Sequence, residues 1–99
     1  MQRILLAEDD ESMRRFLVKA LERAGYKVEA FGDGAAAYEC LQTQSFTMLL
    51  TDIVMPEMDG IELARRAAEL DPELRIMFIT GFAAVALHPD AHAPKEARI

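Results

Sequence analysis

The sequence has one cysteine, Cys40, and no long apolar run. A single thiol cannot form a disulfide within the chain, so a disulfide framework is excluded and a reducing cytoplasm is expected. No apolar stretch approaches the ~18 residues of a membrane helix, and residues 1–3 lead directly into a strand-like segment. We therefore expect neither a membrane span nor a signal peptide.

Basic residues are also scarce. Eleven Lys and Arg stand against 17 Asp and Glu, which gives a net charge of −6 and argues against direct binding to DNA or RNA. With 99 residues, 52% of them hydrophobic and 28% charged, the chain predicts one small globular domain.

Four segments have the composition of buried strands: residues 3–7, 27–31, 47–51 and 75–79. Residues 27–31 alternate between polar and apolar side chains, which indicates a half-exposed edge strand. Residues 47–51 and 75–79 are continuous apolar runs, which are typical of central parallel strands covered on both faces.

Helical patterns separate these strands. Apolar residues recur with a helical period and predict one core-facing stripe: Met13, Phe16, Leu17, Ala20, Leu21 and Ala24. Gly25 follows as a C-terminal cap. Asp33 is a candidate N-cap for a helix over residues 34–41, and Asp59 begins a capping box before a helix that ends at residues 71–72. Strands alternating with helices predict an α/β domain with a mainly parallel sheet.

Polar side chains stand at three of the predicted strand ends. Glu8 and Asp9 end the first strand, Asp52 ends the third and Thr80 ends the fourth. Carboxyl ends of parallel strands share one edge, so the three carboxylates are expected in one crevice, where Mg²⁺ relieves their repulsion. The acidic run at residues 8–11 is equally compatible with a helix cap or a solvated surface. Asp52, placed after an apolar strand, favours a carboxylate nucleophile for phosphoryl transfer, with the Thr80 hydroxyl as a donor to a phosphoryl oxygen.

Residues 5–10 (LLAEDD), 50–60 (LTDIVMPEMDG) and 79–81 (ITG) together resemble the receiver domain of bacterial two-component response regulators. The resemblance covers the whole chain, and its most specific part is the segment 52–60. It implies a doubly wound, flavodoxin-like (βα)5 fold with the parallel strand order 2-1-3-4-5.

The resemblance also implies a role for each site residue. Asp52 is the phosphoacceptor and Thr80 is the switch hydroxyl. Mg²⁺ is expected to bind Asp9 and Asp52 directly, Glu8 through water, and the backbone carbonyl of Val54.

Residues 13–21, 61–64 and 77–87 are similar to the CpdR group of single-domain regulators. Those proteins act in alphaproteobacterial cell-cycle phosphorelays and, when unphosphorylated, prime substrate delivery to the ClpXP protease. The resemblance implies a cytoplasmic phosphoaspartate switch, not a dedicated enzyme, that takes its phosphoryl group from a histidine kinase or histidine phosphotransferase. Its output is expected through protein contacts, with ClpX as a candidate partner. A binding module or adaptor that works without phosphorylation is the alternative.

Residues 1–99 are expected to form a single receiver domain in which the fifth strand, its Lys and the last helix are missing and residues 88–99 form a loop. Lys95 precedes the expected position of that strand and is not assigned the role.

Other candidate sites have simpler explanations. The glycines at 32 and 34 are typical of a turn more than of a phosphate cradle. His88, His92 and Cys40 lack the paired spacing of a zinc site. A haloacid-dehalogenase phosphatase would need Asp-x-Asp after the first strand, which this chain lacks. Arg14 and Arg15 fit a docking site for the phosphodonor protein and a solvated helix face equally well.

Two methionines have a more specific interpretation. Met55 and Met58 lie beside Asp52 in the sequence, and we expect them to shape a surface for a partner.

Overall fold

The computed structural model describes residues 2–79 of the chain. Its elements are β1 (Arg3–Ala7), α1 (Glu11–Arg23), β2 (Lys27–Phe31), α2 (Gly34–Thr43), β3 (Met48–Thr51), α3 (Gly60–Leu70) and β4 (Arg75–Phe78). β1 and β2 have the predicted bounds, β3 begins one residue late and β4 ends one residue early. The expectations about Thr80, the loop at 88–99 and a missing fifth strand lie outside the described residues.

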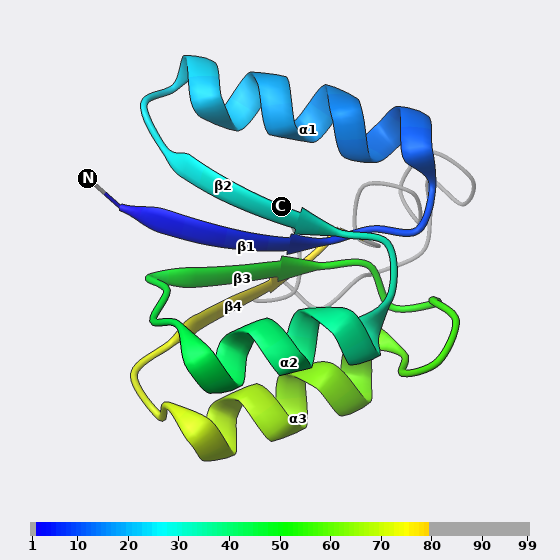
Figure 1. The fold of residues 1–99 in the computed structure, drawn as a ribbon, viewed down its shortest axis with the longest axis vertical. Helices are drawn as coiled ribbons and strands as arrows, with labels where there is room; N and C mark the ends of the chain where they lie inside the picture. Colours follow the sequence, from blue (N-terminus) through cyan, green and yellow to red (C-terminus); the bar gives the residue numbers. More distant parts are fainter. Residues whose placement is uncertain (1, 80–99) are drawn as a thin grey trace, which may run out of the picture.

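The four strands described form one parallel sheet in the order β2-β1-β3-β4 (Figure 1). β1 lies between β2 and β3, so that Leu5 stands opposite Glu29 on one side and Leu49 on the other. β3 pairs in turn with β4. This order confirms the predicted doubly wound α/β fold, and it places the carboxyl ends of β1 and β3 next to each other.

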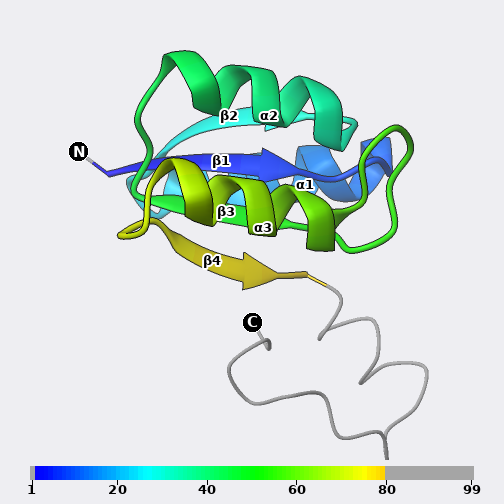
Figure 2. The same cartoon turned by 90° about the horizontal axis from the view of Figure 1, so that it is seen from below.

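Helices cover both faces of the sheet, α2 and α3 on one face and α1 on the other (Figures 1 and 2). Side chains alternate between the faces of a strand, so β1 supplies Leu5 to the α2–α3 side and Ile4 and Leu6 to the α1 side. Burying one such side chain contributes about 1.5–3 kcal/mol. Packing on both faces therefore fixes the position of β1 and of the acidic residues that follow it.

α1 ends as predicted, with Gly25 directly after its C-cap at a φ of 101°, and the structure adds Asp10 as its N-cap. Its core-facing stripe differs from the prediction. Leu17 packs on the sheet together with Val18, whereas Phe16 is 66% exposed. Successive helical residues are about 100° apart. Phe16 and Val18 therefore lie on opposite sides of Leu17, and the sheet covers the Val18 side.

The N-caps of α2 and α3 are Asp33 and Asp59, as predicted. Only half of the predicted capping box forms. Asp59 accepts the N–H of Glu62 at 2.8 Å, but the Glu62 carboxylate pairs with Arg65 and Arg66. Hydrogen bonds from these two arginines lower the pKa of Glu62 to about 2.

β4 is less buried than its apolar sequence predicts. β3 is buried at three of its four positions, whereas β4 is exposed at Arg75 and half-buried at the other three. Within residues 2–79, β4 pairs with a strand on one side only and forms a border of the sheet (Figure 2). Periodicity identifies the strand but does not give its position in the sheet.

No helix within residues 2–79 is long and apolar enough to cross a membrane.

Candidate functional site

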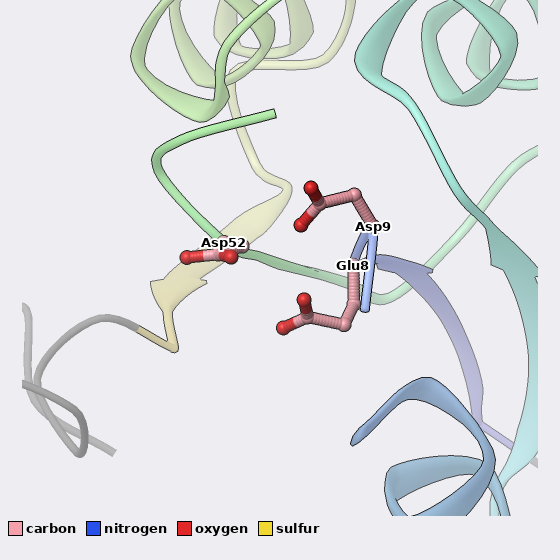
Figure 3. A group of neighbouring side chains, drawn as sticks. All are labelled: Glu8, Asp9 and Asp52. Atoms are coloured by element: carbon pink, nitrogen blue, oxygen red, sulfur yellow. The ribbon is translucent and has the colours of Figure 1, made fainter. Parts of the chain in front are cut away.

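Three carboxylates meet where β1 and β3 end. Glu8 and Asp9 follow β1 and Asp52 follows β3, and one oxygen of each lies within 4.8 Å of the other two (Figure 3). The N–H of Asp52 donates to the carbonyl of Ala7 at 2.9 Å, which extends the pairing of the two strands into the site. The expected proximity of these acids is thereby confirmed, and it follows from β1 and β3 being neighbours.

Glu8 is the most deeply placed of the three, with 4% of its surface exposed. Its carboxylate accepts the N–H of Asp10 at 2.9 Å. Burial raises the pKa of Glu8 to about 7; the hydrogen bond from Asp10 opposes this shift, and the charges of Asp52 and Asp9 add to it. Near neutral pH this carboxyl group therefore holds a proton for much of the time.

The stability of the metal-free protein should fall as the pH rises from about 5 to 8. Glu8 ionises near pH 4.5 when unfolded and near pH 7 when folded, so between these values the folded state binds more protons. Ionisation then favours unfolding by up to about 3 kcal/mol. Urea melts in a chelator across this range provide the measurement. Glu8→Gln should flatten the dependence and be the more stable protein at pH 8, whereas an equally steep profile for Glu8→Gln would assign the effect to another group.

Asp52 is half-buried, and its two oxygens have different surroundings. Oδ1 accepts the N–H of Ile53 at 2.8 Å, whereas Oδ2 accepts no hydrogen bond from the described residues. The Thr51 hydroxyl donates to the Asp52 carbonyl at 2.8 Å and fixes the backbone from the other side. One carboxylate oxygen is thus held in place, and the other is available to a ligand or a reacting group.

Two glycines allow close backbone contacts around the site. A Cβ on Gly60 would lie 1.9 Å from the carbonyl oxygen of Asp52, and a Cβ on Gly34 would lie 2.0 Å from that of Met58. The sequence does not predict these contacts, because no local pattern marks either pair of backbone segments as neighbours. The need for glycine at position 34 is steric, which differs from both the turn and the phosphate cradle considered from the sequence.

The loop between β3 and α3 presents a mixture of buried and exposed side chains. Val54 is 77% exposed, and Glu57 adopts a φ of 71°, an uncommon backbone conformation for a residue other than glycine. Met55 is buried in the core on the α2–α3 side, which corrects its expected place on a partner surface. Met58 is half-buried against the same core.

The two arginines near the start of α1 have different surroundings. Arg14 is half-buried, and its Nη1 donates to the backbone carbonyl of Glu8 at 2.8 Å. Arg15 is exposed and pairs with Glu11 at 2.5 Å. Arg14 is therefore a neighbour of the acidic site, a placement that the sequence did not indicate because its side chain reaches the site by folding back from the helix. Thr80, His88 and His92 lie outside the described residues.

The donor set of the site suits a hard divalent cation. At their separation, two ionised carboxylates such as Glu8 and Asp52 repel by about 3–4 kcal/mol at an effective dielectric constant near 20. Mg²⁺ prefers one or two carboxylates together with water and phosphate oxygens. The Glu8–Asp9–Asp52 cluster can therefore hold Mg²⁺, and a bound cation would favour loss of the proton from Glu8.

Known proteins are similar to this chain in sequence or in fold. CpdR, a response regulator receiver protein of Brucella abortus (strain 2308), is 73% identical over 99 residues, which are 100% of this chain and 82% of that protein. The response regulator TrrA of Thermotoga maritima, in a crystal structure with Mg²⁺-BeF, is 26% identical and has a TM-score of 0.76, covering 79% of this chain and 68% of that one.

A crystal structure of the histidine kinase ThkA in complex with TrrA also matches, with a TM-score of 0.80 over 100% of this chain and 84% of that chain. Its identity of 21% shows the fold alone. The family model of the response regulator receiver domain matches residues 4–94. This match covers nearly the whole chain and includes all three carboxylates, and the chain therefore belongs to the response regulator receiver domain family of two-component signalling.

Proposed function

We propose that the chain is a phosphoaspartate switch of a two-component phosphorelay and that Asp52 is its phosphoacceptor. The observation that carries this proposal is the convergence of Glu8, Asp9 and Asp52 within 4.8 Å at the ends of two neighbouring parallel strands. Asp52 has the reactive position, because its Oδ1 is held by the N–H of Ile53 while Oδ2 is available for attack. In the transfer, Oδ2 forms a bond to phosphorus as the phosphorus–nitrogen bond of a phosphohistidine donor breaks, and the released imidazole takes up a proton.

The same proposal assigns Mg²⁺ to the acidic cluster. Asp9 and Asp52 would bind it directly, Glu8 through water, and Val54 through its backbone carbonyl. Bound there, the cation would neutralise charge on the incoming phosphoryl group. Glu8 lies deepest and Asp9 is exposed, which fits a water-mediated role for the first and direct contact for the second.

Thr80 is proposed as the switch hydroxyl that donates to a phosphoryl oxygen. The support lies in the residue before it. Ile79 donates its N–H to the carbonyl of Thr51 at 2.9 Å, so the chain at position 79 runs beside the residue that precedes Asp52.

We propose a histidine kinase or histidine phosphotransferase as the phosphodonor and α1 as its docking surface. Phe16 is exposed on this helix, close in sequence to the acidic site, and offers apolar area to a partner. TrrA is seen in complex with the histidine kinase ThkA. The acidic net charge argues against a nucleic-acid partner.

The proposed output is regulation of the ClpXP protease in the cytoplasm, as part of cell-cycle control, through protein contacts and not as a dedicated enzyme. Its support is the 73% identity to CpdR over the whole chain. Residues 1–99 would act as one receiver domain. The alternative is a module that binds its partner irrespective of phosphorylation.

Incubation with acetyl phosphate separates these two functions. With Mg²⁺, intact-mass spectrometry should show a species heavier by one phosphoryl group, and a chelator should abolish it, because the metal neutralises charge on the donor. A chain that stays unmodified in Mg²⁺ but still binds a CpdR-type partner, such as purified ClpX, would support the alternative. Unaltered modification in the chelator would contradict the metal-dependent mechanism.

A further inference from the structure

We propose that Arg14 is a positioning residue that orients the Glu8–Asp9 pair for cation binding; this inference rests on the proposed function of the acidic site. Arg14 Nη1 donates to the backbone carbonyl of Glu8 at 2.8 Å. That carbonyl belongs to the planar peptide group that joins Glu8 to Asp9. A hydrogen bond to it therefore fixes the plane from which the Asp9 side chain projects toward Asp52.

Arg14 completes a set of three contacts around Glu8. The N–H of Glu8 donates to the carbonyl of Phe31 at 3.0 Å, and its carboxylate accepts the N–H of Asp10 at 2.9 Å. Arg14 supplies the remaining contact, to the Glu8 carbonyl. Without it, the first two contacts still hold the residue, but the peptide leading to Asp9 can rotate.

The Arg14 guanidinium also packs closely against the loop after β2. A Cβ on Gly32 would lie 3.2 Å from Arg14 Nη1. The Arg14 side chain therefore passes close to Gly32, which has no side chain to obstruct it. Arg14 thus lies between the loop that carries Glu8 and Asp9 and the loop that precedes α2. This placement differs from that of the neighbouring Arg15, which is exposed on α1.

The charge of Arg14 and its positioning role predict opposite changes in Mg²⁺ affinity when Arg14 is removed. As a nearby cation it repels Mg²⁺, so removing its charge should strengthen metal binding if electrostatics alone mattered. As a positioning residue it strengthens binding by holding Asp9 in place, and its removal should weaken binding. The sign of the change therefore distinguishes the two explanations.

The experiment compares R14Q with R15Q by titrating Mg²⁺ and following the amide shifts of Asp9 and Asp52. Both variants remove one positive charge from the same helical turn, but only R14Q removes a contact to Glu8. We expect R14Q to bind Mg²⁺ about tenfold more weakly than wild type, in the range known for residues that support a metal ligand. R15Q should stay within about twofold, because exposed charges are screened.

Equal or tighter Mg²⁺ binding by folded R14Q would overturn the inference. If R14Q does not fold, R14K decides: it keeps the charge but lacks the guanidinium fork, so binding about threefold weaker supports positioning and unchanged binding overturns it. Wild-type protein that does not respond to Mg²⁺ would overturn the proposed metal site and this inference together. Mg²⁺ binding without modification of Asp52 would overturn only the phosphoacceptor role.

Discussion

Asp52→Asn should abolish the Mg²⁺-dependent gain of one phosphoryl group from acetyl phosphate. An amide oxygen is neutral and a far weaker nucleophile than a carboxylate, and the substitution also removes one of the three carboxylate groups of the cation site. Little else should change, since the Asn side-chain oxygen can still accept the N–H of Ile53, as Oδ1 does now at 2.8 Å. Intact-mass spectrometry of both proteins, followed by mapping of the labelled peptide, provides the measurement.

Asp59→Asn is the matched control for this prediction. It makes the same chemical change in the same loop, at the N-cap of α3, where Asn caps a helix as well as Asp does. It should therefore be modified like wild type. Labelling of Asp52→Asn to the wild-type extent, or equal loss of labelling in Asp59→Asn, would exclude Asp52 as the specific acceptor.

The sequence predicted the elements well because their signals are local. Residues 3–7 and 27–31 became β1 and β2 with the expected bounds, and Asp33 and Asp59 cap the helices that were assigned to them. Such features depend on hydrogen bonds between residues close in sequence, or on a run of apolar side chains. The order of the strands required the family resemblance as well, since several sheets are compatible with the same alternation.

The features that differ from the sequence predictions depend on contacts between residues far apart in the sequence. Apolar residues on α1 defined a stripe around Leu17, but only packing against the sheet decides that Val18 faces inward and Phe16 outward. Met55 was interpreted from its closeness to Asp52 in sequence, whereas the loop turns it into the core. The spacing of apolar residues indicates that a helix has an apolar stripe, but it does not determine which edge of the stripe the sheet will cover.

Within the site, the sequence predicted the acids but not the groups that hold them. Glu8, Asp9 and Asp52 could be brought together from the strand ends once β1 and β3 were taken as neighbours. Arg14 could not be added, because a long side chain with several rotatable bonds reaches many positions from the first turn of a helix. The close approach of Gly60 to Asp52 likewise depends on the path of the loop between them, and it has a measurable consequence.

Gly60→Ala should destabilise the protein by about 3–5 kcal/mol, which is a large fraction of the stability of a small domain. The added Cβ would lie 1.9 Å from the carbonyl oxygen of Asp52 and 2.9 Å from the Cα of Ile53. Both are backbone atoms, so relief requires movement of the loop itself and strains the 2.7 Å hydrogen bond from the Gly60 N–H to the Ile53 carbonyl. The helix-propensity gain of alanine, at most about 1 kcal/mol, is too small to offset this strain.

Urea denaturation of Gly60→Ala beside Gly25→Ala tests whether the steric contact is responsible. Gly25 has nothing within 4 Å of an added Cβ but adopts a φ of 101°, so alanine there introduces only backbone strain, worth about 1–2 kcal/mol. Gly60→Ala should therefore lose more stability than Gly25→Ala. The same loop movement shifts Asp52, so Mg²⁺ binding should weaken in Gly60→Ala and stay unchanged in Gly25→Ala. A Gly60→Ala protein as stable as Gly25→Ala would show that the loop accommodates a methyl group and that Gly60 does not fix the position of Asp52.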